Sequence, residues 1–177
     1  MPRLFIGLEL PELVRMRLGL VRSPLPGAKW IEPEDMHITL RFAGDIDNPQ
    51  ADELVGFLDQ VEFRPFEVTI RDMGAFGGRD PRVVWAGVEG GAQLEQLQRS
   101  VDRACRSAGL PPEPRAFKPH VTLARLKGTS AEDVAHFLGA RARLAVEPFP
   151  VDHFALFSSR PRVGGGPYVV ENIFPVA

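Results

Sequence analysis

Two short stretches of the sequence repeat the pattern His-x-Thr-Leu, so that each places an imidazole two residues before a hydroxyl. The first begins at His37 and reads His-Ile-Thr-Leu, and the second begins at His120 and reads His-Val-Thr-Leu. Both lie in apolar runs that follow a proline, which predicts a short strand entered from a turn. Because side chains alternate faces along a strand, the histidine and the threonine of each pattern should share one face.

Two histidines on facing strands suit a reaction that transfers two protons. The unperturbed pKa of histidine is about 6.5, so near pH 7 one ring can be neutral while the other is protonated. The neutral ring can take a proton from an attacking water, and the charged ring can give one to the leaving oxygen. The hydroxyls of Thr39 and Thr122 can donate hydrogen bonds to phosphate oxygens. The symmetry of the two patterns does not distinguish the acid from the base.

Each pattern is followed by an arginine that could add a positive charge. Arg41 shares the face of His37 by strict alternation, so we expect it to meet the same anion. Arg125 does not share the face of His120 unless the strand ends or bulges there.

Two phenylalanines are candidates for stacking on a base. Alternation favours core packing for Phe42. Phe76 lies in a segment rich in glycine, residues 74–81, and is open to either reading.

Other kinds of site have less support. Neither pattern carries the third ligand that a metal needs nearby, so no metal or cofactor is expected. A nucleophile turn of the form Gly-x-Ser-x-Gly is absent, which argues against a serine hydrolase. The three glycines at 164–166 favour a turn between two strands over a phosphate cradle. His136 is predicted on the polar side of a helix, and His153 as a surface or packing residue.

Composition limits the remaining possibilities. A chain of 177 residues with 44% hydrophobic content is expected to form one domain over residues 1–177. The net charge of −2 argues against binding nucleic acid through a general basic field, although local arginines could hold a phosphate. No apolar run is long enough to span a bilayer, and no signal peptide is evident. The single Cys105 fits a reducing cytoplasm.

Hydrophobic periodicity predicts an α+β fold. We expect helices from Pro11 to the breakers at 24–27, over 50–62, over 92–108 and from a cap at Ser130. Strands are expected over 3–9, 66–70, 82–88, 151–158 and 168–176, besides the two that carry the motifs. The order strand, helix, motif strand, helix, strand occurs in both halves of the chain. It predicts a bilobal molecule whose two similar lobes, of mostly antiparallel sheet with flanking helices, surround a central cleft.

Several phrases together resemble one known family. They are Arg-Leu-Phe-Ile from Arg3, Trp30 ahead of the first motif, Arg-Val-Val-Trp-Ala-Gly from Arg82, the nine residues 117–125, and Gly-Pro-Tyr at 166–168. With the paired motifs they resemble the RNA 2′,3′-cyclic phosphodiesterase family, also called 2′-5′ RNA ligase, of the two-histidine phosphoesterase superfamily. The resemblance runs from about residue 3 to residue 175.

The resemblance implies a bilobal fold with a water-filled cleft and no metal. It implies hydrolysis of 2′,3′-cyclic phosphate RNA ends to 2′-phosphates and, in some members, reversible ATP-independent joining of tRNA halves through a 2′-5′ linkage. We therefore expect a cytoplasmic enzyme, a monomer with no membrane partner, that acts on RNA ends or small cyclic phosphates.

The resemblance also implies residue roles. His37 matches the proton donor and His120 the proton acceptor, while Thr39, Thr122 and Arg125 match phosphate contacts. Two alternatives remain: a phosphodiesterase for another cyclic phosphate, derived from a nucleotide or from ADP-ribose, and an RNA-end binding module without turnover. Two intact histidines argue against the second, because binding alone would be served as well by arginine or lysine.

Overall fold

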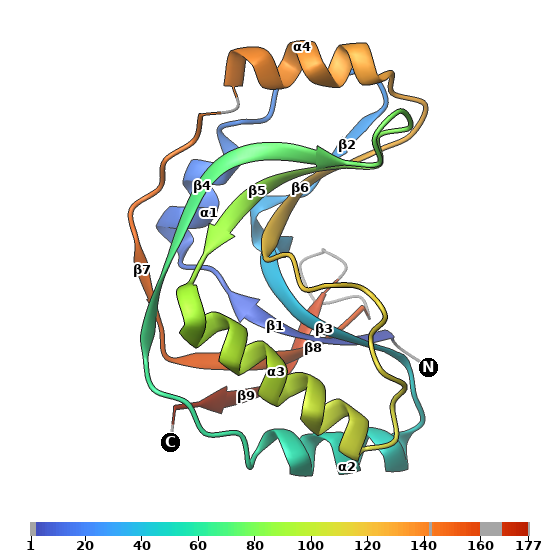
Figure 1. The fold of residues 1–177 in the computed structure, drawn as a ribbon, viewed down its shortest axis with the longest axis vertical. Helices are drawn as coiled ribbons and strands as arrows, with labels where there is room; N and C mark the ends of the chain where they lie inside the picture. Colours follow the sequence, from blue (N-terminus) through green and yellow to red (C-terminus); the bar gives the residue numbers. More distant parts are fainter. Residues whose placement is uncertain (1–2, 142, 160–167, 177) are drawn as a thin grey trace.

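The fold is described from a computed structural model, which describes residues 3–141, 143–159 and 168–176. Within these residues nine strands form one curved sheet in which every pairing is antiparallel (Figure 1). In chain order they are β1 (Arg3–Glu9), β2 (Ala28–Trp30), β3 (His37–Asp45), β4 (Phe66–Phe76), β5 (Val83–Glu89), β6 (His120–Leu126), β7 (Phe149–Val151), β8 (His153–Ser158) and β9 (Val169–Pro175). The predicted α+β class with an antiparallel sheet is confirmed.

The sheet consists of two halves that meet at one point. The strand order is β7-β4-β5-β6-β3-β1-β8-β9, with β2 paired to the outside of this path on β6. The central strands β3 and β6 pair only through Ile38 and Val121, both fully buried. Each motif strand is therefore the inner edge of its own half of the sheet.

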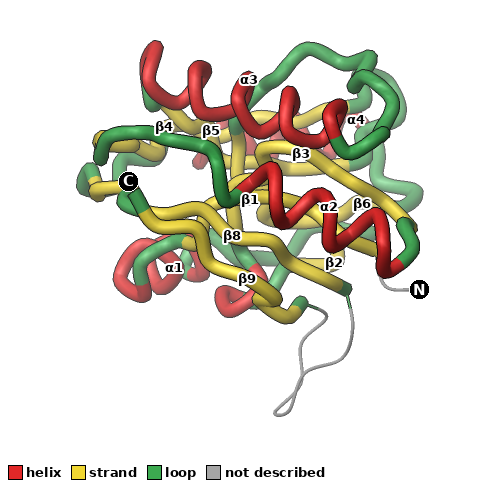
Figure 2. Tube along the Cα trace, turned by 90° about the horizontal axis from the view of Figure 1, so that it is seen from below, coloured by secondary structure: helices red, strands yellow, loops and turns green. Residues whose placement is uncertain are grey.

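The two halves of the sheet do not correspond to the two halves of the chain. Strands β8 and β9 come from the C-terminal part, yet β8 pairs with β1, and Figure 2 shows β1, β8 and β9 side by side. The N-terminal motif strand therefore lies in a sheet half completed by the last strands of the chain.

Four helices and one 3-10 turn accompany the sheet in the described residues. They are α1 (Glu12–Gly19), η1 (Pro33–Asp35), α2 (Asn48–Leu58), α3 (Gly91–Ser107) and α4 (Ala131–Arg141). The carboxylate of Asp47 accepts a hydrogen bond from the Gln50 amide at 2.9 Å and caps α2. The hydroxyl of Ser130 accepts one from the Asp133 amide at 3.0 Å, which confirms the predicted cap of α4.

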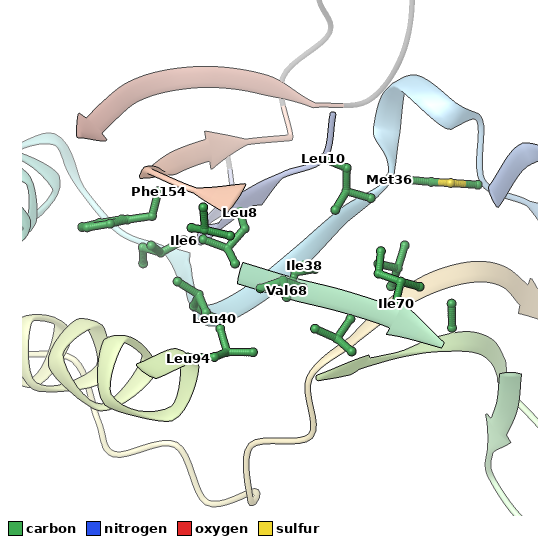
Figure 3. Close-up of a cluster of buried hydrophobic side chains, with 14 of the residues drawn as sticks. Ile6, Leu8, Leu10, Met36, Ile38, Leu40, Val68, Ile70, Leu94 and Phe154 are labelled. Carbon is green, nitrogen blue, oxygen red and sulfur yellow. The ribbon is translucent and has the colours of Figure 1, made fainter. Parts of the chain in front are cut away.

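The core lies between the sheet and the helices. Figure 3 shows Ile6 and Leu8 of β1 with Ile38 and Leu40 of β3, packed near Leu94 of α3. All five side chains are at most 3% exposed. Burial of one such side chain contributes about 1.5–3 kcal/mol, so the strands that carry the motifs are anchored firmly through their inner faces.

Three boundaries differ from the sequence expectations. Helix α1 ends at Gly19, a weak helix former, while Val21 and Leu25 reach the core from the turns that follow. Helix α2 begins two residues earlier than expected, because Asp47 is the cap. Strand β4 continues to Phe76 through the segment predicted as a loop.

The extension of β4 depends on Gly74. This residue pairs with Trp85 of β5, and a Cβ there would clash with the indole ring. The missing side chain of Gly74 leaves the space that the indole of Trp85 fills, and β4 continues through this position.

No helix in the described part of the chain is long and apolar enough to cross a bilayer. The predicted turn at 164–166 lies outside the described residues.

Candidate active site

The bridge between β3 and β6 brings the two motifs together. Ile38 and Val121 face the core, so the residues on either side of each point to the opposite face. The histidine–threonine cluster on that face consists of His37, Thr39, His120 and Thr122. A proton on His120 would add to the effects that lower the pKa of His37, which is consistent with the rings being neighbours.

Both imidazoles are held in the same way. Nδ1 of His37 lies 2.9 Å from the carbonyl oxygen of Asp35, and Nδ1 of His120 lies 2.6 Å from that of Lys118. A carbonyl can only accept a hydrogen bond, so Nδ1 carries the proton in each ring. The chemistry is therefore left to Nε2, the atom that a neutral ring uses as a base and a protonated ring as an acid.

The surroundings of His37 are aromatic. Its ring centroid lies 4.6 Å from that of Phe5, 5.7 Å from Phe157 and 5.3 Å from Tyr168. The pKa of His37 is lowered to about 4, chiefly by burial. The hydrogen bond to the Asp35 carbonyl opposes this shift, whereas the charge of Arg125, and that of His120 when protonated, add to it. The unliganded protein therefore holds His37 neutral at pH 7, with Nε2 positioned 3.0 Å from the hydroxyl of Thr39.

A bulge interrupts both motif strands at the same place, the leucine of His-x-Thr-Leu. Thr39 pairs with Gly7 and Arg41 with Ile6, which leaves Leu40 without a partner in β1. In the same way Leu123 has no partner in β5, between Thr122 and Ala124. The extra residue reverses the alternation, so the leucine and the residue after it are both buried.

The bulge makes the prediction for Arg41 wrong. This side chain is 6% exposed and turns toward α3, where Nε donates to Asp102 at 2.8 Å. Its other nitrogens donate to the backbone carbonyls of Phe42 and Pro111. Arg41 therefore joins β3 to α3, with each of its three nitrogens bonded to a protein group, and is buried away from the site face.

The two bulges each bring one further residue to the site face. Phe42 is 53% exposed and its ring lies 6.0 Å from Phe5, so the predicted core packing is wrong. Arg125 occupies the equivalent place after the second motif, five residues beyond its histidine. It donates to the hydroxyl of Tyr168 at 3.3 Å.

Phe76 reaches the second histidine. Its ring meets that of His120 edge to face at 5.0 Å and lies 5.4 Å from Trp85, which pairs with Thr122. The sequence placed Phe76 in a loop, but the structure places it at the end of β4 beside the histidine–threonine cluster.

Sequence reasoning missed the aromatic residues around His37. Phe5 comes from β1, Phe157 from β8, and Tyr168 from the position just before β9, and no local spacing links them to the motif. The first bulge has no local signal, because the residues from Ile38 to Phe42 alternate between apolar and polar as in a regular strand.

The remaining histidine with clear partners is His153. Its ring bridges Glu9, at 2.9 Å, and Asp152, at 2.7 Å, and these carboxylates raise its pKa although burial opposes them. Among the described residues no group of three histidine, cysteine or acidic side chains could hold a metal ion.

Comparisons with known proteins identify the family of the chain. Residues 11–161 match the family model of the 2′-5′ RNA ligase superfamily. The chain is 33% identical, over 97% of both proteins, to an RNA 2′,3′-cyclic phosphodiesterase of Methanothermobacter thermautotrophicus. It is 44% identical, over 66% of both, to a protein of the same name from Aeropyrum pernix.

Solved structures share the fold. A protein of Thermus thermophilus superposes with a TM-score of 0.78 at 28% identity, over 98% of this chain and 97% of its own. Escherichia coli LigT, solved with 3′-AMP, superposes with a TM-score of 0.80 over 100% of this chain and 99% of its own. At 23% identity, the likeness to LigT is one of fold.

Proposed function

The chain belongs to the 2′-5′ RNA ligase superfamily, and we propose that it hydrolyses the 2′,3′-cyclic phosphate at an RNA end to a 2′-phosphate. The observation that carries the proposal is the pair of imidazoles on facing strands, each with Nδ1 bound to a backbone carbonyl and Nε2 left for proton transfer. The names of the relatives support the substrate class.

In the proposed reaction a water attacks phosphorus while His120 Nε2 accepts its proton. The bond from phosphorus to the 3′ oxygen breaks, and His37 Nε2 donates a proton to that oxygen. One water is consumed, and the product carries a 2′-phosphate and a 3′ hydroxyl. Thr39, Thr122 and Arg125 hold the phosphate oxygens, on which negative charge grows in the transition state.

The donor role of His37 requires that substrate binding change its protonation. With a pKa of about 4, roughly one ring in a thousand is protonated at pH 7. An anionic phosphate beside Arg125 offsets the charge of that residue, which lowers this pKa, and its own negative charge favours the protonated ring. We infer that substrate binding raises the pKa of His37, so that the ring takes up the proton that it later donates to the leaving oxygen.

The same site can serve related reactions. With the 5′ hydroxyl of a second RNA as the nucleophile in place of water, the same displacement of the 3′ oxygen would form a 2′-5′ linkage. Other cyclic phosphates, or binding without turnover, are the alternatives.

We also propose that residues 1–177 form a single bilobal domain that acts as a monomer in the cytoplasm. The interleaved sheet halves support one domain, and the single cysteine, buried and unpaired, supports a reducing compartment.

The test is incubation with a short RNA that ends in a 2′,3′-cyclic phosphate, in the presence of EDTA. We expect turnover to a 2′-phosphate, identified by phosphorus NMR, and loss of turnover in His37→Ala and His120→Ala. A 3′-phosphate product would contradict the proposed regiochemistry. Binding without turnover would favour the binding module, and turnover only of cyclic nucleotides or ADP-ribose cyclic phosphates would favour the other alternative.

A further inference from the structure

A cavity of about 250 Å³ lies beside the histidine–threonine cluster. It is bounded by the end of β1, by α1 and η1, and by the first residues of the last strand. His37 and Tyr168 line it, and Tyr168 accepts the hydrogen bond from Arg125. The cavity therefore adjoins both the proposed proton donor and the proposed phosphate contact.

The size of the cavity limits what it can hold. Pockets for whole small molecules have volumes of about 300–1,000 Å³, so this one suits a fragment of a nucleotide. Its walls include the buried side chains of Leu10 and Met36 and the ring of Phe157. Such walls are suited to a flat, largely apolar ring.

The charges at the cavity disfavour a second phosphate. Three carboxylates line it, those of Glu9, Glu34 and Asp35, against the single guanidinium of Arg15. A phosphate would be repelled there, whereas a group that donates N–H hydrogen bonds would be favoured.

Glu34 is the carboxylate best placed to receive such a donor. Glu9 already accepts from His153 at 2.9 Å, and Asp35 is buried. Glu34 is exposed, and its carboxylate makes no hydrogen bond or ion pair with another residue in the described part of the chain.

We propose that this cavity holds the base of the nucleotide that carries the cyclic phosphate, and that Glu34 selects bases with an exocyclic amino group. A carboxylate accepts a hydrogen bond from N4 of cytosine, and uracil offers a carbonyl at the same position. Cytosine and uracil have nearly the same size and differ along one edge, where cytosine has the N4 amino group beside an N3 acceptor and uracil has a carbonyl beside an N3–H donor. The inference rests on the proposed phosphodiesterase activity.

The experiment compares kcat/KM for cytidine and uridine 2′,3′-cyclic phosphates. We expect the unaltered protein to prefer cytidine by about 10-fold, which is the scale of one hydrogen-bonded base contact. Glu34→Gln should reduce the preference to less than 3-fold, mainly through a higher KM for cytidine. Glu32→Gln is the matched control: this exposed neighbour pairs with Arg22 at 3.5 Å and does not line the cavity, so the preference should stay.

A second arm removes the base. Val169→Trp fills the cavity, so it should slow both nucleoside substrates at least 10-fold and leave 1-O-methylribose 2′,3′-cyclic phosphate within 2-fold. Equal rates for cytidine and uridine in the unaltered protein, or an unchanged preference in Glu34→Gln, would overturn the base subsite. Equal slowing of all three substrates by Val169→Trp would do the same. No turnover of any cyclic phosphate by the unaltered protein would instead refute the proposed function.

Discussion

At the scale of single residues, the surroundings of His37 control its protonation. Its ring lies among Phe5, Phe157 and Tyr168, and its pKa falls to about 4. A depressed pKa in a histidine means that the neutral form is favoured in the folded state. Protonation of the ring therefore costs free energy, and an anion bound nearby can offset that cost.

We predict that His37 titrates near pH 4 in the free protein and at higher pH when inorganic phosphate is bound. Arg125→Ala should also raise the pKa, because it removes a positive charge that lowers it. Histidine chemical shifts followed by NMR from pH 3 to 8 measure both effects. A free-state pKa above 6, or no change with phosphate, would show that His37 does not gain its proton through the substrate.

A change of leaving group assigns the two histidines. Each alanine variant should lose roughly 10²- to 10⁴-fold in rate on the natural substrate. A 3′ sulfur in place of the 3′ oxygen leaves without a proton, so His37→Ala should recover most of its rate, while His120→Ala should stay slow because water still needs a base. Rescue of His120→Ala instead would reverse the two roles.

At the scale of elements, the paired bulges decide which side chains reach the site face. Both occur at the leucine of His-x-Thr-Leu and both turn the residue two positions later to the site face. That position holds Phe42 after the first motif and Arg125 after the second. The two motif strands therefore have equivalent backbones, but β3 presents an aromatic ring at this position and β6 presents a positive charge.

The charge at Arg125 should matter to turnover. Loss of a charge-assisted contact costs roughly 1.5–3 kcal/mol, so Arg125→Ala should reduce kcat/KM by about 10- to 150-fold. Arg106→Ala, an exposed arginine on α3, is the control and should stay within 2-fold. Unchanged kinetics in a folded Arg125→Ala variant would remove this residue from the phosphate site.

Arg41 should matter to stability. Its ion pair with Asp102 is nearly buried, whereas Arg106 meets the same carboxylate at 3.1 Å from an exposed position. Arg41→Met should lower the free energy of unfolding by about 3 kcal/mol, because the largely buried carboxylate of Asp102 loses the opposite charge beside it. Arg106→Met should cost less than about 1 kcal/mol. Urea denaturation measures both. Equal costs would mean that burial does not distinguish the two pairs.

At the scale of the whole molecule, the chain crosses between the halves of the sheet. Strand β8 pairs with β1 and carries Phe154 and Leu156 into the core, and it also supplies Phe157 to the surroundings of His37. The first motif is thus completed by residues more than a hundred positions away.

A truncated chain tests this dependence. Residues 1–151 contain both motifs but lack β8 and β9, so we expect no cooperative thermal transition by circular dichroism and no turnover. A chain lacking only Ala177 serves as the control and should unfold cooperatively. Cooperative unfolding of residues 1–151 would indicate that the halves are independent lobes.

The sequence by itself determined the features that depend on neighbours along the chain. Alternation over three residues placed His37 beside Thr39 and His120 beside Thr122 on one face, and apolar periodicity located the helices and the class of fold. These rules hold because a strand or a helix fixes the directions of side chains only a few positions apart.

Only the tertiary structure decided what depends on pairing across the sheet. Alternation failed at Arg41 and Phe42 because the bulge is defined by the register of β3 against β1, which the motif strand alone does not contain. The low pKa of His37 likewise comes from rings on β1, on β8 and just before β9. Desolvation is the sum of contacts from distant parts of the chain, so the spacing within the motif could not predict it.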